Sequence, residues 1–132
     1  MFKWLIKATV IMKRIEAFVP NTKRSRAVEA AIKAGAEGVT IAETRGRGSG
    51  ERPTVGSARG TARYIAEYSR TDTLIAIVDD SKVESVVQAI IDAVHTGSRG
   101  DGKIFITNVE KSYDISSQTS SSGSMPKGYK PS

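Results

Sequence analysis

Residues 83–109, VESVVQAIIDAVHTGSRGDGKIFITNV, decide the fold of this chain. Their first part places apolar side chains on one stripe with helical spacing, which predicts an amphipathic helix. The stripe consists of Val83, Val86, Val87, Ile90, Ile91 and Val94. The glycine-rich stretch 96–103 predicts a turn, and 104–109 predicts a strand. The segment therefore reads as a helix, a turn and a final strand.

A strand–helix–strand unit is also predicted in the first half of the chain. Residues 13–19 alternate between apolar and polar side chains, which is typical of a strand. A helix is expected to open at Pro20 with Asn21 or Thr22 as its N-cap, and to end at Gly35, where a left-handed conformation suits glycine. Its buried stripe would consist of Ala27, Val28, Ala31 and Ile32. A second strand is expected from about residue 38 to 44.

The remaining strand completes a recognisable order of elements. Residues 73–78 form a nearly continuous apolar run, which is typical of a central strand. Asp79, Asp80 and Ser81 are expected to cap the following helix and to place carboxylates at the positive end of its dipole. The order β-α-β, long loop, β-α-β predicts a ferredoxin-like α+β fold, with four antiparallel strands and two helices on one face.

Composition limits the class of protein. The 132 residues suffice for one domain, and with 39% hydrophobic but only 6% aromatic residues its core must be mostly Ile, Val and Ala. The net charge of +6 suits a nucleic acid, an acidic partner or a phosphorylated ligand. The lack of cysteine excludes disulfides, thiolate zinc sites and a cysteine nucleophile, and it fits a reducing, cytoplasmic location.

Two terminal segments flank the predicted domain, which spans residues 12–115. Residues 1–11 form an N-terminal extension whose apolar run is too short to span a bilayer and lacks a secretory cleavage site. We interpret it as a loosely packed arm, or alternatively as a docking segment anchored by Trp4. Residues 116–132 are rich in serine and are expected to be disordered, because they cannot bury enough apolar surface to offset the entropy of ordering.

The turn at 96–103 has the chemistry of an anion site. Glycines let backbone N–H groups approach an anion closely, because no Cβ blocks them and positive φ angles cost little. Lys103 adds a mobile positive charge, and Asp101 gives the turn a fixed acceptor. Taken alone, a glycine-rich basic turn more often only reverses the chain, so the pattern needs a wider context.

That context is a family resemblance. The pattern Thr-Gly-x-x-Gly-Asp-Gly-Lys-Ile-Phe at 96–105 resembles the C-terminal signature of the PII signal-transduction family. Residues 13–17 are similar to the family's first strand, and 38–48 to its second strand and the base of its long loop. The return of that loop is matched by Arg59, Gly60 and Tyr64. The resemblance implies a homotrimer with its sheets facing inward and an adenine nucleotide in each cleft between subunits.

The resemblance also implies which residues bind ADP, AMP or ATP. The phosphates would be held by Gly100, Asp101, Gly102 and Lys103. The loop base would contribute Gly46, Arg47 and Gly48, with Thr40 and Ala76 near the adenine and ribose and Arg70 near the terminal phosphate. Thr40 and Ala76 suit plain strand packing equally well, as Arg47 and Arg70 suit a solvated surface.

A second implied feature is the long loop, about residues 47–66, which carries Arg52, Arg59 and Arg63. In the family, this loop docks on a regulated transporter or enzyme, and its posture changes with the bound ligand. The loop is therefore expected to bind the partner protein, and any contact with a membrane is expected only through a transporter.

The chain departs from the family pattern at two places. The family glutamine that helps to hold the Mg²⁺–2-oxoglutarate complex is replaced by Ser49-Gly50, and glycine offers a hard cation no side-chain oxygen. Two arginines that clamp the outer phosphates are replaced by Asp114 and Ser116, which should weaken triphosphate binding most. We therefore expect ADP or AMP to compete well with ATP. These departures modestly favour a variant that responds to bicarbonate in inorganic-carbon metabolism over a classical nitrogen-status regulator of ammonium transport.

Other functional classes fit less well. His95, the only histidine, suits the C-terminal end of a helix dipole, and no Ser/His/Asp set or metal-ligand cluster is apparent, so we expect no enzyme. RNA-recognition modules share this order of strands and helices but need aromatic side chains exposed on central strands. Residues 73–78 have none and the first strand has only Phe18. A nucleic-acid-binding module is the alternative from another class, and no nucleic acid is expected as partner.

Overall fold

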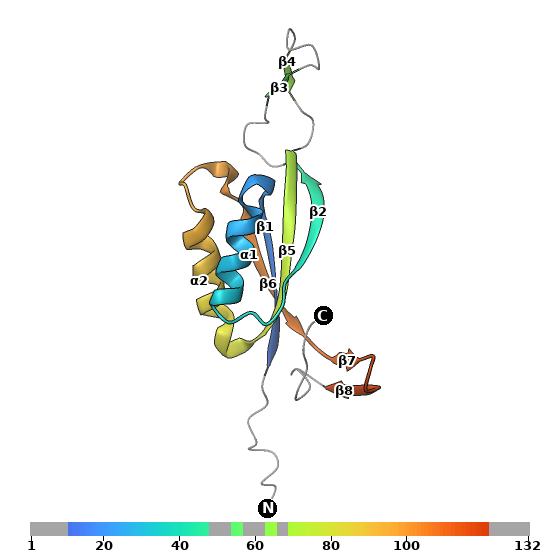
Figure 1. The fold of residues 1–132 in the computed structure, drawn as a ribbon. Helices are drawn as coiled ribbons and strands as arrows, with labels where there is room; N and C mark the ends of the chain where they lie inside the picture. The colour runs from blue at the N-terminus through green and yellow to red at the C-terminus, as the bar shows by residue number, and fades with distance from the viewer. Residues whose placement is uncertain (1–10, 48–53, 57–62, 66–68, 122–132) are drawn as a thin grey trace, which may run out of the picture.

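The computed structural model describes residues 11–47, 54–56, 63–65 and 69–121. Four strands form an antiparallel sheet in the order β2-β5-β1-β6, and both helices cover one of its faces (Figure 1). The strands are β1 (Met12–Pro20), β2 (Thr40–Gly46), β5 (Ser69–Asp79) and β6 (Lys103–Val109), and the helices are α1 (Arg24–Lys33) and α2 (Val83–Val94). The predicted ferredoxin-like α+β fold is confirmed.

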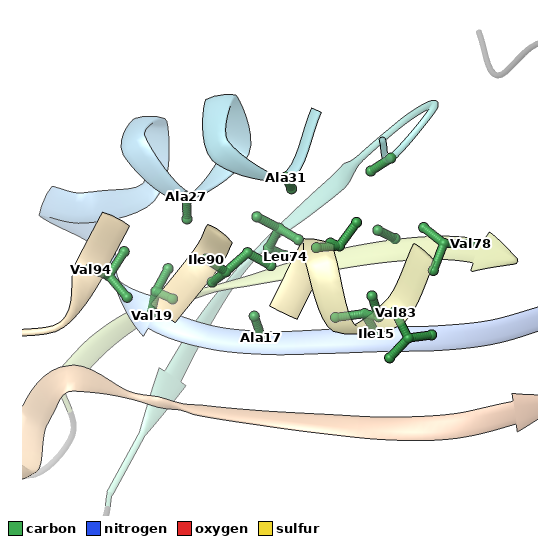
Figure 2. Packing of buried hydrophobic residues seen from close by; sticks show 13 residues of the cluster. Ile15, Ala17, Val19, Ala27, Ala31, Leu74, Val78, Val83, Ile90 and Val94 are labelled. Atoms are coloured by element: carbon green, nitrogen blue, oxygen red, sulfur yellow. The ribbon is translucent and has the colours of Figure 1, made fainter. Parts of the chain in front are cut away.

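The register of the strands fixes which side chains enter the core. Ile15 in β1 lies opposite Ala76 in β5 and Ile106 in β6. Because successive side chains of a strand point to opposite faces, alternate residues of β1 and β5 face the helices (Figure 2). The buried cluster consists of Ile15, Ala17, Val19, Ala27, Ala31, Ala36, Leu74, Ala76, Val78, Val83, Val86, Ile90 and Val94. It is made of small and branched aliphatic side chains, as the composition indicates.

Both helices begin later than predicted. A short 3₁₀ turn, Asn21–Lys23, precedes α1, and a second one, Asp80–Lys82, precedes α2. The N-cap positions are therefore Lys23 and Lys82, neither of which caps its helix with a side-chain hydrogen bond. The predicted caps at residues 21–22 and 79–81 are wrong, because each 3₁₀ turn moves the first helical residue further along the chain.

Most residues of the two predicted apolar stripes face the core, but one isoleucine at the edge of each stripe is exposed. Ala27 and Ala31 of α1 are buried, but Ile32 is 51% exposed. In α2, Ile91 is 39% exposed because it borders an open groove, whereas the other members of the stripe are buried or half-buried. Gly35 follows α1 with φ +119°, in agreement with the prediction that glycine would end this helix.

Two small hairpins lie outside the main sheet. β3 (Thr54–Gly56) pairs with β4 (Arg63–Ile65) in the long segment between β2 and β5, and β7 (Ser112–Asp114) pairs with β8 (Thr119–Ser121) near the C-terminal end. The strand Thr119–Ser121 thus lies within the stretch 116–132 for which the sequence predicts disorder. The N-terminal extension up to residue 10 and the tail beyond 121 lie outside the described residues. Neither α1 nor α2 is long and apolar enough to cross a membrane.

Candidate functional site

The turn between α2 and β6 is organised around the Asp101 carboxylate. This group accepts hydrogen bonds from the Thr96 hydroxyl, from the Thr96 backbone N at 2.7 Å and from the Gly97 N at 2.9 Å. Lys23 Nζ lies 3.9 Å from Asp101 Oδ1 and donates to the Val94 carbonyl oxygen at 2.9 Å. The Thr96 hydroxyl, the backbone donors and the Lys23 charge lower the pKa of Asp101 to about 2. Asp101 is therefore an anion that shapes the turn.

Several backbone donors of the turn are used within it. Gly100 N donates to Ser98 Oγ at 3.0 Å, and Asp101 N donates to the Ser98 carbonyl oxygen at 3.2 Å. Gly102 adopts φ +117° and packs directly on the backbone of β1. The Lys103 ammonium is exposed and open to an incoming anion, whereas the amides of Gly100 and Asp101 already donate to Ser98. The sequence reasoning treated these amides as a ready cradle and missed their internal partners.

An apolar groove of about 400 Å³ opens beside this turn, between α2 and β6. Its apolar walls include Ile91, Val94, Ile104 and Ile106, and its polar end carries His95, Asp101 and Lys103. The sequence predicts Ile91 on the apolar stripe of this helix. The helical stripe could not reveal the groove, because its outer wall is the edge strand β6.

The other half of the predicted site lies at the foot of the long loop. Gly46 pairs with Ser69, and Arg45 pairs with Arg70 one step further into the sheet. Arg47 follows β2 as an exposed residue. The described part of the chain thus brings Gly46, Arg47 and Arg70 together where β2 ends and β5 begins. Gly48, Arg52 and Arg59 lie outside the described residues, and the structure places only the backbone of Arg63, in β4.

Arg70 is held by carboxylates that the sequence reasoning missed. Its Nη2 lies 2.7 Å from Glu43 Oε1, and its Nε lies 3.6 Å from Asp72 Oδ1. The Asp72 side chain is fully buried, and its Oδ2 accepts a hydrogen bond from Arg24 Nη1 at 3.1 Å. An aspartate directly before the apolar run of β5 was the available signal, because a charge at such a position needs a partner.

Two predicted contact residues have different surroundings. Thr40 is exposed at the start of β2, opposite Ile75. Ala76 is 1% exposed and packs in the aliphatic core under the helices, so its side chain lines no surface cleft. Within the described residues, no group of three or more acidic or histidine side chains is arranged to hold a metal ion.

The two halves of the site lie at the same end of the sheet but on opposite edges. Lys103 pairs with Phe18, which pairs with Thr73, which in turn pairs with Ala42, while Gly46 and its partner Ser69 lie four residues further along β2 and β5. β6 and β2 are the outer strands, so three strand spacings, roughly 14 Å, separate them. One chain therefore does not bring Lys103 and the loop foot together.

Comparisons with known proteins agree with this architecture. The family model "Nitrogen regulatory protein P-II" matches residues 12–119. Proteins of that name from Azospirillum brasilense and Nostoc punctiforme are 38% and 39% identical over 100 residues, which cover 76% of this chain and 88% of each relative. A crystal structure of Arabidopsis thaliana PII bound to citrate has a TM-score of 0.64 at 24% identity and covers 85% of this chain and 90% of that one, which supports the fold. The chain belongs to the P-II family of nitrogen regulatory proteins.

Proposed function

We propose that this chain is a regulatory protein without enzymatic activity that binds adenine nucleotides in clefts between the subunits of a homotrimer. The observation that carries the proposal is the placement of its two cationic half-sites on opposite edges of one sheet. A ring of identical subunits closes such edges on each other, so that Lys103 of one copy meets the loop foot of the next.

The face of the sheet that the helices leave uncovered supports this assembly. The Phe18 and Phe105 rings lie edge to face with their centroids 6.0 Å apart, and Phe105 is 49% exposed. Ile75 and Ile77 belong to the same face of β5 and are half-buried. An apolar sheet face of this kind is stabilised by a second layer, and in the proposed trimer the sheets of the neighbouring subunits supply it.

The charges around the half-sites indicate a ligand with few phosphates. Lys103, Arg47 and Arg70 attract an anion, and the Arabidopsis relative is bound to a polyanion, citrate. Glu43 and Asp72 neutralise much of the charge near Arg70. Asp114, which replaces a family arginine, adds a further negative charge and accepts a hydrogen bond from Ser117 N at 3.2 Å. We therefore expect ADP or AMP to bind at least as tightly as ATP, without a requirement for Mg²⁺.

The long loop is the proposed contact with a regulated partner in nitrogen or inorganic-carbon metabolism. Its arginines at 52, 59 and 63 would favour an acidic surface on a cytoplasmic enzyme or on the cytoplasmic side of a transporter. A role in inorganic-carbon metabolism, with bicarbonate as a second ligand, is favoured by the loss of the 2-oxoglutarate glutamine at Gly50. The alternative is a classical nitrogen-status regulator of ammonium transport.

Calorimetry tests the ligand class directly. The wild-type protein is titrated with ATP, ADP, AMP, bicarbonate and 2-oxoglutarate, the last in the presence of Mg-ATP. We expect adenylate binding that Lys103→Gln weakens about tenfold, as for a lost charge-assisted contact. The matched control is Lys33→Gln, an exposed lysine in the last turn of α1, and it should bind like the wild type.

Two results would favour a different function. Tight 2-oxoglutarate binding with Mg-ATP would favour the classical nitrogen regulator. Salt-dependent binding of oligonucleotides without adenylate binding would instead favour the nucleic-acid module.

A further inference from the structure

Five charged side chains form a pattern at the foot of the long loop, and we call them the loop-foot cluster. They are Arg24, Glu43, Arg45, Arg70 and Asp72. Across β2 and β5, like charges stand directly opposite each other: Glu43 pairs with Asp72, and Arg45 pairs with Arg70. Directly opposed like charges destabilise a sheet, whereas the diagonal neighbours here carry opposite charges. The diagonal contact of Arg70 with Glu43 therefore compensates for both unfavourable pairs.

Arg70 has one fixed and one exposed carboxylate neighbour. The Asp72 side chain is fully buried and is held by Arg24, so it has little freedom to move. The Glu43 side chain is 67% exposed and reaches Arg70 Nη2 at 2.7 Å. The Arg70 side chain is itself 45% exposed, so an external anion can approach it. Of the two carboxylates, Glu43 is the one that such an anion would displace.

The contacts of Asp72 show that Arg70 does not satisfy both carboxylates at once. Asp72 Oδ1 accepts no hydrogen bond from any described residue, and the Arg70 Nε is 3.6 Å away. A buried carboxylate oxygen without a hydrogen bond is unfavourable. A shift of Arg70 towards Asp72 would therefore be favourable once the ion pair between Glu43 and Arg70 is broken. The cluster thus supports an exchange of partners at the Arg70 guanidinium.

We propose that Glu43 competes with the ligand for Arg70 and thereby determines how strongly the site discriminates between adenine nucleotides with different numbers of phosphates. This inference rests on the proposed nucleotide function and assigns Arg70 to the outermost phosphate of the longest ligand. ATP must displace Glu43 to reach Arg70, whereas the single phosphate of AMP binds near Lys103 of the neighbouring copy. Glu43 therefore disfavours ATP and leaves AMP unaffected.

The test is calorimetric titration of the wild type and Glu43→Gln with AMP, ADP and ATP. Removal of the competing carboxylate should raise the affinity for ATP about two- to fivefold, the range of one exposed ion pair, and leave AMP unchanged. In an Arg70→Gln background, Glu43→Gln should no longer change the affinity for ATP. The control is Glu29→Gln, which removes an exposed charge from the middle of α1 and should change neither affinity.

The outcomes separate this inference from the proposed function. If the wild type binds no adenylate, the nucleotide function fails and the inference fails with it. In the other case the wild type binds adenylates, but Glu43→Gln changes the affinities for AMP and ATP equally, or still changes the affinity for ATP in the Arg70→Gln background. Either result would refute the competition and leave the nucleotide function standing. Circular dichroism checks that each variant is folded, and Glu43→Asp, which shortens the side chain, gives a second way to weaken the 2.7 Å contact.

Discussion

Gly102 lies so close to the carbonyl group of Phe18 that no side chain fits between them. A Cβ atom built on Gly102 would overlap the Phe18 carbonyl oxygen and lie 3.1 Å from the carbonyl carbon. The residue also adopts φ +117°, which side chains disfavour. This glycine therefore lets the turn after α2 lie flat on β1, and it places Lys103 in register with Phe18.

Gly102→Ala should consequently destabilise the protein by about 3 kcal/mol or more, because backbone must move in addition to the strain at positive φ. Gly97→Ala, at φ +93° but with open space around it, should cost only about 1–2 kcal/mol. Gly100→Ala meets ordinary contacts at 3.6 Å and should be close to neutral. Urea unfolding of the three variants measures this order, and an equal effect of all three would refute the role assigned to Phe18.

Asp101→Asn should make the protein less stable at neutral pH and less sensitive to acid. The folded-state pKa of about 2 lies below the unfolded value of about 3.9, so the stabilisation is fully present above pH ~4 and is lost as the pH falls towards 2. The asparagine variant should lose this part of the pH dependence. Thermal unfolding at several pH values between 2 and 7 measures it.

Asp92→Asn is the control for that experiment, because Asp92 is exposed and accepts its hydrogen bond from the Gln88 side chain of the same helix. It should keep the wild-type slope between pH 4 and 2. A wild-type slope in Asp101→Asn as well would show that folding does not lower the pKa of Asp101.

Asp72→Ala should lower the free energy of unfolding by about 2–3 kcal/mol. The change removes the buried carboxylate next to Arg24 and Arg70 and leaves both arginines with the exposed Glu43 as their acidic neighbour among the described residues, so one member of a buried pair is lost. Glu43→Gln should cost less than about 1 kcal/mol, because that carboxylate is largely exposed. Denaturant unfolding compares the two, and the reverse order would contradict the anchoring role of Asp72.

Mixed trimers should recover nucleotide binding that neither parent shows. Lys103→Glu reverses the charge on the β6 side of the proposed cleft, and Arg47→Glu reverses the charge on the loop-foot side. Every cleft in a trimer of one variant therefore carries one of the two changes. When the two variants are refolded together, about a quarter of the clefts should combine an intact edge with an intact foot. Equilibrium binding of labelled ADP measures the recovery. Mass spectrometry checks that the refolded trimers contain both variants. The shared cleft would be contradicted if such mixed trimers bound no ADP, or if either variant refolded alone bound ADP.

Local patterns in the sequence are enough to predict the kind and order of the main elements. Alternation in β1, the apolar run of β5 and the helical stripe of α2 are local patterns, and each follows from the burial of apolar side chains, on one face for β1 and α2 and on both faces for β5. The glycines of the turn after α2 were likewise readable, because a requirement for positive φ is a property of single residues. Such features need no knowledge of distant partners.

The tertiary structure decided the features that depend on distant partners. The 3₁₀ turns before both helices override the local capping signals. Hydrogen bonds to Ser98 give the amides of Gly100 and Asp101, two members of the predicted phosphate site, partners within the turn. The register of β2 against β5 brings Glu43 and Asp72 to Arg70, and the strand order places Lys103 and Gly46 on opposite edges. Pairing between segments far apart in the chain sets these relations, and no periodicity within a single segment encodes it.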